Sequence, residues 1–300
     1  MIKPLPVTVI GGYLGAGKTS LVNHLLRNAD GLRLAVLVNE FGALPIDEDL
    51  IVAQEDDIIS IAGGCVCCSY GSDMAAALTD LRKLDPAPVH VILEASGVAL
   101  PGAIAGSVGL MQGYSMDGVV IVADAETLRA NANHKYMGDT VTRQLADADI
   151  VVLNKVDLVN DKTRADSASF ARSYAKDAQL LMAEHGALPP EVLLQSFVGR
   201  NRDSGARHDT SGFDSVSLPM DRPCDPAALG HLLASEELDL VRAKGFVRDA
   251  DGAIHAVQSV SRRWSSEAAP EDSPIGLVCI GLKPGFDGDA VARKIADLIG

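Results

Sequence analysis

The sequence predicts an α/β fold in which the first two-thirds of the chain form a mostly parallel sheet and a smaller α+β domain follows. Short apolar runs alternate with segments of helical periodicity, an order typical of β–α units with parallel strands. The run at 89–93 is almost continuously apolar, as expected for a strand that helices cover on both faces. A polar, aperiodic stretch at 199–212 predicts a linker. We therefore predict a first domain at 1–198 and a second domain at 213–300.

The first domain is predicted to open with a strand at 7–10, a glycine-rich loop and a helix at 18–27. Apolar runs predict its other strands at 34–38, 58–62, 89–93, 118–123, 150–153 and 179–183. Apolar residues spaced three and four apart predict its other helices at 72–84, 140–146 and 162–174.

The second domain is predicted to contain strands at 215–218, 238–246, 254–261 and 276–281. Asp225 offers an N-cap, and Pro226 a first-turn proline, for a helix that continues through Leu233. Another helix is predicted after Asp287, and one of its faces carries the apolar residues Val291, Ile295 and Leu298. Strands with two helices in so short a segment predict a small α+β domain.

Charge and hydropathy argue against two classes of partner. The 300 residues carry a formal net charge of −14 without any basic run, and such a surface repels nucleic-acid backbones. No apolar stretch approaches the ~18 residues that a membrane helix requires. We therefore expect a cytoplasmic protein that binds neither nucleic acid nor membrane.

The loop between the first strand and the first helix matches the phosphate-binding pattern GxxxxGK(S/T) over Gly12–Thr19. Glycines let the backbone wrap around a phosphate, and a helix start offers free N–H groups and a positive dipole end. Lys18 can reach the β and γ phosphates, and Thr19 can ligate Mg²⁺. The pattern predicts a P-loop NTPase domain with nucleotide-binding residues at Gly12, Gly15, Ala16, Gly17, Lys18, Thr19 and Ser20.

A second nucleotide motif, NKxD, follows the strand predicted at 150–153 and consists of Asn154, Lys155, Val156 and Asp157. The Asp157 carboxylate can accept hydrogen bonds from N1–H and the 2-amino group of guanine, whereas adenine lacks this pair of donors. Buried polar recognition of this kind discriminates strongly, because the wrong base leaves a charge unpaired. The motif therefore favours GTP over ATP.

An acidic residue, Glu94, ends the strand predicted at 89–93 and is followed by Ala95-Ser96-Gly97. Beside a phosphate loop, Glu94 stands where a magnesium-bound water would lie, and the Gly97 N–H could face the γ-phosphate. The alternative is a strand end that Ser96 caps, with a turn glycine after it.

Three cysteines, Cys65, Cys67 and Cys68, follow the strand predicted at 58–62. The CxxC spacing lets thiolates from one turn converge on a borderline cation such as Zn²⁺. A dithiol redox pair and plain apolar packing are the alternatives. Because parallel strands end at one edge of the sheet, the cysteines and the phosphate loop are predicted to be neighbours.

These motifs together resemble the CobW/YjiA family of P-loop GTPases. The elements that carry the resemblance are GGYLGAGKTS, Asn39-Glu40-Phe41-Gly42, GGCVCC, EASGVALP and NKVD, with Ala243-Lys244-Gly245-Phe246 and Trp264 in the second domain. The resemblance implies a slow GTPase of the metal-handling class, similar to cobalamin-biosynthesis proteins, nitrile hydratase activators and zinc chaperones. Such a protein hydrolyses GTP and delivers Zn²⁺ or Co²⁺ to a client protein or a cofactor pathway.

By the same resemblance, Asn39 and Glu40 belong to a segment that responds to the nucleotide, and Glu40 is a candidate catalytic residue. Cys65, Cys67 and Cys68 are implied to be the metal ligands. This chain departs from many relatives in its linker. Their linker carries a histidine-rich tract, whereas this chain has only His208 there. Two other functions stay open: a nucleotide-gated regulator whose cysteines sense redox state, and an ATP-dependent kinase with a structural metal.

Overall fold

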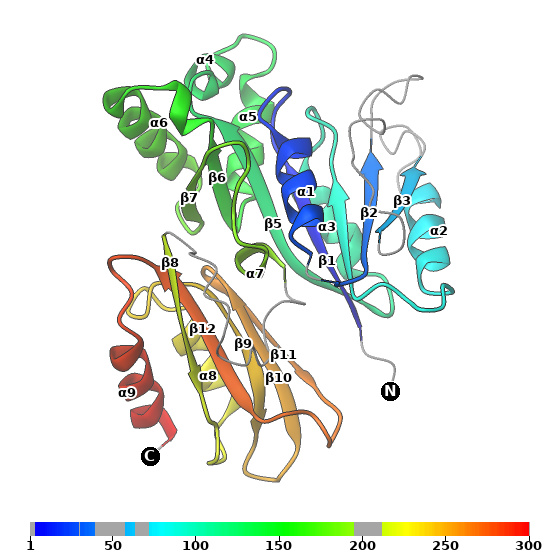
Figure 1. Ribbon diagram of the computed structural model, residues 1–300, viewed down its shortest axis with the longest axis vertical. Helices are drawn as coiled ribbons and strands as arrows, with labels where there is room; N and C mark the ends of the chain where they lie inside the picture. Colours follow the sequence, from blue (N-terminus) through cyan, green and yellow to red (C-terminus); the bar gives the residue numbers. More distant parts are fainter. Residues whose placement is uncertain (1–3, 30, 40–57, 64–71, 195–211, 300) are drawn as a thin grey trace. The chain divides into compact units, whose positions relative to one another are not determined.

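In a computed structural model, the chain divides into two compact units, one within Pro4–Ser196 and the other within Phe197–Gly300 (Figure 1). The structure describes residues 4–29, 31–39, 58–63, 72–194 and 212–299. The predicted boundaries at 198 and 213 stay predictions, because most of the linker lies outside these ranges.

The first unit is built on a seven-stranded sheet with the strand order β3-β2-β4-β1-β5-β6-β7. Every neighbouring pair in this sheet is parallel, which confirms the predicted α/β class. Its strands are β1 (Leu5–Gly11), β2 (Leu34–Asn39), β3 (Ile58–Gly63), β4 (His90–Glu94), β5 (Tyr114–Asp124), β6 (Ile150–Asn154) and β7 (Gln179–Ala183). All residues of β1, β4 and β6 are buried, as expected for strands covered on both faces.

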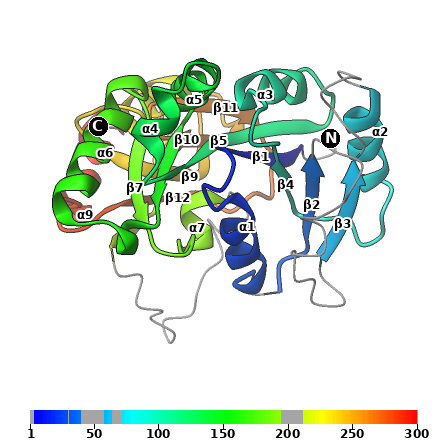
Figure 2. The same cartoon turned by 90° about the horizontal axis from the view of Figure 1, so that it is seen from above.

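Helices cover both faces of this sheet, as the view from above shows (Figure 2). One face carries α1 (Lys18–Arg27) and the short α7 (Pro190–Leu193). The other face carries α3 (Pro101–Gly109), α4 (Leu128–Ala132), α5 (Gly138–Ala146) and α6 (Asp161–Tyr174). A further helix, α2 (Ser72–Leu81), packs its Leu78 and Leu81 into one apolar cluster with Ile104 and Val108 of α3.

Three helices of this unit were not predicted. The sequence of α3 is rich in glycine and alanine and lacks a clear polar face, so Pro101 at its first turn was the main signal available. The helices α4 and α7 have five and four residues, too few for a periodic pattern. Helix α2 ends at Leu81 rather than at the predicted residue 84.

Strand β5 begins at Tyr114, four residues before the predicted start at 118, because a β-bulge interrupts the pattern. Val7 of β1 pairs with Met116 and Thr8 pairs with Gly118, so Asp117 is the extra residue. The Asp117 carboxylate lies 3.0 Å from Thr8 Oγ1, which also lies 2.8 Å from His90 Nε2. The Leu193 carbonyl, at 3.4 Å, is a more distant acceptor for the single Thr8 proton. With that proton donated to Asp117, the Thr8 oxygen would accept from His90 in the tautomer that carries Nε2–H. These polar side chains lie inside the sheet and are buried.

The second unit is a five-stranded antiparallel sheet with the order β11-β10-β9-β12-β8. Its strands are β8 (Phe213–Leu218), β9 (Leu240–Arg248), β10 (Ile254–Val260), β11 (Arg263–Ala268) and β12 (Gly276–Leu282). Among residues 212–299, its helices are α8 (Pro226–Leu233), which Asp225 caps as predicted, and α9 (Gly288–Ile299). The helices and strands share one apolar core, which confirms the predicted α+β domain.

Several details of the second unit differ from the prediction; strand β9, for example, runs over Leu240–Arg248 rather than 238–246. Val291 and Ile295 of α9 are buried in the core, but Leu298 is 40% exposed, because the covered face continues through Ile299, four residues after Ile295, rather than through Leu298. The edge strand β11 was not predicted, because its sequence RWSSEA is polar and all six of its residues are half-buried or exposed. Burial raises the pKa of both thiols in this core, to about 12 for Cys279 and in the same direction for Cys224.

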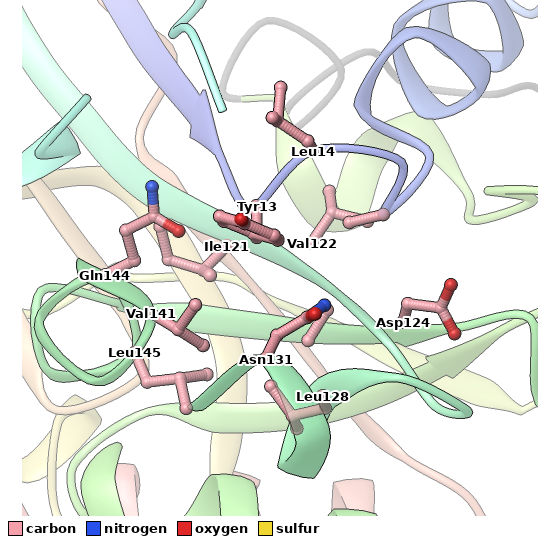
Figure 3. A pocket seen from close by; sticks show the side chains of 12 residues that line it. Tyr13, Leu14, Ile121, Val122, Asp124, Leu128, Asn131, Val141, Gln144 and Leu145 are labelled. Atoms are coloured by element: carbon pink, nitrogen blue, oxygen red, sulfur yellow. The ribbon is translucent and has the colours of Figure 1, made fainter. Parts of the chain in front are cut away.

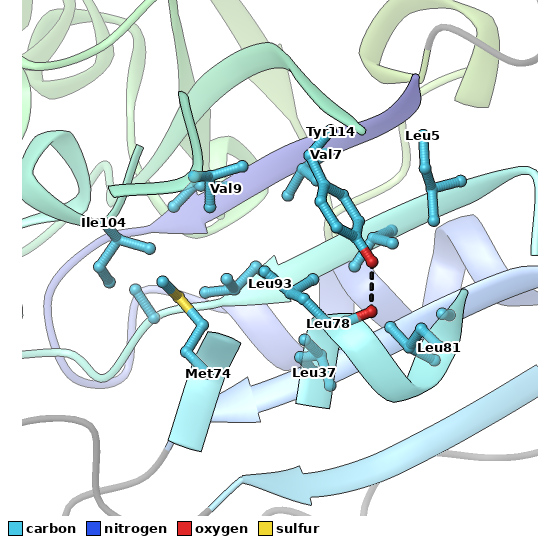
Figure 4. Close-up of a cluster of buried hydrophobic side chains, with 14 residues drawn as sticks. Leu5, Val7, Val9, Leu37, Met74, Leu78, Leu81, Leu93, Ile104 and Tyr114 are labelled. Atoms are coloured by element: carbon cyan, nitrogen blue, oxygen red, sulfur yellow. Dashed lines mark hydrogen bonds between the residues drawn. The ribbon is translucent and has the colours of Figure 1, made fainter. Parts of the chain in front are cut away.

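Tyr114 ties α2 to the sheet of the first unit. Its hydroxyl donates a hydrogen bond to the Leu78 carbonyl inside the apolar cluster (Figure 4). Burial raises the pKa of Tyr114 to about 12, against the opposing effect of the nearby Arg82 guanidinium. The folded protein therefore keeps this phenol protonated at a pH at which the unfolded chain ionises it.

We expect Tyr114→Phe to reduce the free energy of unfolding by about 1 kcal/mol at neutral pH, because one buried hydrogen bond is lost. The Tyr114 pKa is raised on folding, so its contribution is complete below pH 10.0 and disappears as the pH rises toward about 12. In the variant, the free energy of unfolding should therefore not show this decrease at alkaline pH. Urea unfolding at several pH values measures it, with the exposed Tyr136→Phe as the control. Parallel curves for wild type and Tyr114→Phe would contradict the assignment.

Candidate nucleotide site

The phosphate loop begins where β1 ends and passes close over β5. Gly12 has φ +135°, and a Cβ at this position would collide with the Val122 carbonyl of β5. Gly17 has φ +101°, and its Cβ would collide with the Asn154 side chain. These two positions therefore require glycine both for backbone conformation and for space.

Helix α1 starts at Lys18 and has the N-terminus that an anion site needs. Its N-cap is Gly17, so no side chain caps its first N–H groups, and its first turn holds no acidic residue. Free N–H groups and the helix dipole both favour a bound phosphate there. Ala16 is buried below this turn, whereas Gly15 and Ser20 are exposed, and Lys18 and Thr19 are half-buried.

Glu94 lies beside Thr19, as expected from the two motifs. Strand β4 pairs with β1 so that Glu94 is level with Ile10, and the Ala95 N–H donates to the Ile10 carbonyl at 2.8 Å. The Thr19 hydroxyl donates to Glu94 Oε1 at 3.1 Å, and Glu94 is only 4% exposed. The parallel register therefore brings a carboxylate and a hydroxyl together at the end of the phosphate loop.

Gly97 approaches the phosphate loop so closely that only glycine fits. A Cβ on Gly97 would lie 2.8 Å from the Leu14 backbone nitrogen. Gln144 of α5 was not predicted, yet its Nε2 donates to the carbonyls of Gly97 at 3.1 Å and Ala99 at 2.8 Å. The loop after β4 is therefore enclosed between the phosphate loop and α5.

Asn154, the first residue of NKxD, joins two loops. Its Nδ2 donates to the Ala16 carbonyl at 3.0 Å, and its Oδ1 accepts from the Gly186 N–H at 2.9 Å. The side chain is buried, with 1% of the residue exposed. Asn154 therefore holds the phosphate loop against the loop after β7.

Lys155 and Asp157, the other two motif residues, lie at the same edge of the sheet. Lys155 has a left-handed backbone with φ 61°, and its Nζ lies 2.8 Å from Asp124 Oδ2. Asp124 also accepts from the Glu126 N–H at 2.8 Å, so it was a site residue that sequence reasoning missed. Asp157 lies in the 3₁₀ turn η2 (Val156–Leu158), and its side chain is 25% exposed and open to a ligand.

His185 lies in the loop after β7, next to Asp157. Its Nε2 is 3.9 Å from Asp157 Oδ2, and its side chain is 86% exposed. The sequence offered no pattern for this neighbour, because a single histidine is more often an ordinary surface residue.

A small, mostly apolar pocket lies next to the phosphate loop (Figure 3). Tyr13 and Leu14 of the loop, β5, α4 and α5 form its walls. Polar groups enter it from Asp124, Asn131 and Gln144. The pocket therefore lies between the phosphate loop and α5, the helix whose Gln144 holds the loop after β4.

Several predicted residues lie outside the described ranges, namely Glu40 and the cysteines Cys65, Cys67 and Cys68. Of Asn39 only the backbone is described: it ends β2 and pairs with Gly63, which ends β3. In the parts of the chain that the structure describes, no group of three His, Cys, Asp or Glu residues could hold a metal ion. The same parts include no helix long and apolar enough to cross a membrane.

The contact between Gly186 and α1 gives a test of the site. We expect Gly186→Ala to destabilise the fold and to weaken nucleotide binding, because its Cβ would lie 2.7 Å from the Leu21 nitrogen. Gly31 has nearly the same φ, +70° against +71°, but nothing lies within 4 Å of an added Cβ. Gly31→Ala should therefore show only the backbone cost, about 1–2 kcal/mol.

Denaturant unfolding and titration with a fluorescent nucleoside triphosphate measure both effects for the Gly186 and Gly31 variants. Equal nucleotide affinity in the two variants would mean that the Gly186 contact does not support the site.

Comparisons with known proteins identify the family of the chain. The model of the CobW/HypB/UreG nucleotide-binding domain matches residues 6–181, and that of the cobalamin synthesis protein cobW C-terminal domain matches residues 213–299. The chain is 32% identical to "Zinc chaperone CobW" of Sinorhizobium sp, over 98% of this chain and 97% of that protein. It is 28% identical to "Zinc chaperone YjiA" of Escherichia coli (strain K12), over 89% of each.

Among solved structures, a Zn(II)-bound YjiA GTPase from E. coli is 22% identical, with a TM-score of 0.46 over 99% of each chain. The first family model alone matches more than half of the chain, and the CobW relative matches it over almost its full length. The chain therefore belongs to the CobW/HypB/UreG family of nucleotide-binding proteins and carries the cobW C-terminal domain.

Proposed function

We propose that the protein is a GTP-hydrolysing metallochaperone that binds Zn²⁺ and delivers it to a client protein or a cofactor pathway. One observation carries this proposal: a connected nucleotide site, from Thr19 and Glu94 to Asp157, lies in a chain that matches a protein named a zinc chaperone over 98% of its length. A cytoplasmic location fits this function, because GTP and reduced thiols are both present there.

The phosphate loop supplies the positive charge that an acidic protein needs to bind a triphosphate. Lys18 and the first N–H groups of α1 would hold the phosphates, as their place at the helix start supports. Lys18 also neutralises charge that develops on the transferred phosphoryl group.

Mg²⁺ fits the residues at the start of α1. The Thr19 hydroxyl and the Glu94 carboxylate are 3.1 Å apart, and Mg²⁺ prefers oxygen donors of this kind. We propose that Thr19 ligates Mg²⁺ and that Glu94 accepts a hydrogen bond from a magnesium-bound water. When bound, the ion neutralises the charge on the β and γ phosphates. Glu40 stays a candidate for orienting the attacking water, supported by the family resemblance alone.

Guanine recognition is assigned to Asp157, whose carboxylate is partly exposed at the same sheet edge as the phosphate loop. Asn154 is assigned a supporting role, because its buried carboxamide is already bonded to Ala16 and Gly186. Lys155 is held by Asp124, which fixes the lysine stem beside the base site.

Zinc binding is assigned to Cys65, Cys67 and Cys68, because thiolates with CxxC spacing suit Zn²⁺. Co²⁺ suits the same ligands, but the relatives are named for zinc. The remaining cysteines, Cys224 and Cys279, are poor ligands because they are buried in an apolar core and their thiol pKa values are raised.

Strand pairing supports a coupling between the nucleotide and the metal. Val38 of β2 pairs with Glu94 of β4, and Asn39 of β2 pairs with Gly63 of β3. Three adjacent strands therefore end close to the predicted functional residues. Strand β4 ends at Glu94, β2 ends at Asn39, just before Glu40, and β3 ends at Gly63, two positions before Cys65. We infer that the γ-phosphate state changes metal affinity through this edge, so that hydrolysis times the release of zinc.

Base choice is tested with Asp157→Asn, which removes one acceptor and should shift preference from GTP toward xanthosine triphosphate. In the wild type, GTP should bind at least about 100-fold more tightly than ATP. The control is Asp161→Asn, which removes the same charge nearby from a carboxylate that is 92% exposed. Displacement of a fluorescent guanine nucleotide gives the affinities. Equal displacement by ATP and GTP would point to the kinase alternative.

Metal coupling is tested by titrating Zn²⁺ into protein loaded with GDP or with a nonhydrolysable GTP analogue. We expect the analogue to tighten zinc binding about 5- to 150-fold, the usual range of allosteric coupling. Because thiols lose protons on binding, affinity should also rise with pH.

The control for the zinc titration is a pair of variants. The triple Cys65/Cys67/Cys68→Ser variant should lose tight zinc binding, and Cys224→Ala should retain it. Undiminished binding in the triple variant would rule out the assigned ligands. Disulfide formation without zinc uptake would favour the redox regulator.

A further inference from the structure

Gln144 uses a buried carboxamide to hold the loop that follows Glu94. It lies in α5 and is 1% exposed. Its Nε2 donates both protons to this one loop, to the Gly97 carbonyl at 3.1 Å and to the Ala99 carbonyl at 2.8 Å. No nucleotide motif contains Gln144, and it lies 47 residues from Gly97 in the sequence.

The loop between β4 and α3 is fixed at both of its ends. At the first end, the Ala95 N–H donates to the Ile10 carbonyl, and Glu94 accepts from Thr19. At the second end, the Gly102 N–H donates to Asp147 Oδ2 at 2.9 Å, and Asp147 is the C-cap of α5. The one helix α5 and its cap therefore hold both the middle and the end of this loop.

The bonds to Gln144 also set the direction of the peptide groups in the loop. In a trans peptide, the N–H points opposite to the C=O. With the Gly97 and Ala99 carbonyls directed at α5, the N–H groups of Val98 and Leu100 are turned away from α5. Gly97 itself is pressed against the phosphate loop, since its Cβ would lie 2.8 Å from the Leu14 nitrogen.

We propose that Gln144 is a positioning residue for GTP hydrolysis, which holds the loop after β4 in the conformation that meets the γ-phosphate. This inference rests on the proposed function and adds a residue to it. Without the carboxamide, two carbonyls lose their donor, and the loop must move to find other partners. The Thr19–Glu94 contact and the start of α1 stay in place, so GDP binding should be spared.

The test compares Gln144→Met with wild type and with Val141→Ala. Methionine keeps the length of the side chain and removes both donors. Val141 lies in the same helix, lines the same pocket and is buried, so Val141→Ala reproduces a loss of packing without touching the loop. We expect Gln144→Met to lower kcat about 10- to 30-fold with KM and GDP affinity nearly unchanged, the pattern of a lost transition-state interaction. Val141→Ala should keep the wild-type kcat.

A second variant, Gln144→Glu, separates positioning from packing. A carboxylate facing two carbonyl oxygens has no proton to donate, whereas its protonated form has one. Its kcat relative to wild type should therefore rise as the pH falls, while that of Gln144→Met stays flat. A purely structural role would give both variants the same pH profile.

The outcomes distinguish this inference from the proposed function. If the wild type hydrolyses no GTP, the proposed function and this inference both fail. If the wild type hydrolyses GTP and Gln144→Met keeps kcat within about twofold, or Val141→Ala loses as much, the proposed function stands and the role of Gln144 is overturned.

Discussion

The parallel pairing of β1 with β4 and β5 is the constraint on which the nucleotide site depends. Pairing with β4 places Glu94 level with Ile10, two residues before Gly12, where the phosphate loop begins. Pairing with β5 brings the Val122 carbonyl so near to Gly12 that only glycine fits. The loop conformation, the Thr19–Glu94 hydrogen bond and the approach of Gly97 to Leu14 all follow from these two neighbours. The site is thus built from strand ends, as in other open parallel sheets.

Two buried carboxamides then hold the loops that surround the phosphate loop. Asn154 uses its donor and its acceptor on two different loops, whereas Gln144 uses two donors on a single loop. A neutral amide suits such places, because it satisfies backbone groups without the desolvation cost of a buried charge. One side chain at the end of β6 and one in α5 therefore set the relative positions of these loops.

Sequence motifs predicted which strand ends and loops come together at this edge of the sheet, while the roles of their residues remain predictions. Lys18, Thr19, Glu94 and Asn154 belong to motifs, and the strands that carry them are apolar runs. Asp124, Gln144 and His185 could not be predicted, because their roles arise from tertiary contacts between distant segments. The early start of β5 was hidden by the bulge at Asp117. The assignments of Glu40 and the three clustered cysteines remain predictions, since those residues lie outside the described ranges.

The buried group of Thr8, His90 and Asp117 has a consequence for strand register. Hydrogen bonds join these side chains across β1, β4 and β5, all within an otherwise apolar sheet. The hydrophobic pattern of strands that are apolar on both faces does little to distinguish one register from the next, but a slip here would leave a carboxylate and an imidazole buried without partners. A slip of one residue would also move Glu94 by about 3.3 Å relative to the phosphate loop. Polar side chains in the middle of the sheet thereby set the alignment at its edge, where Thr19 meets Glu94.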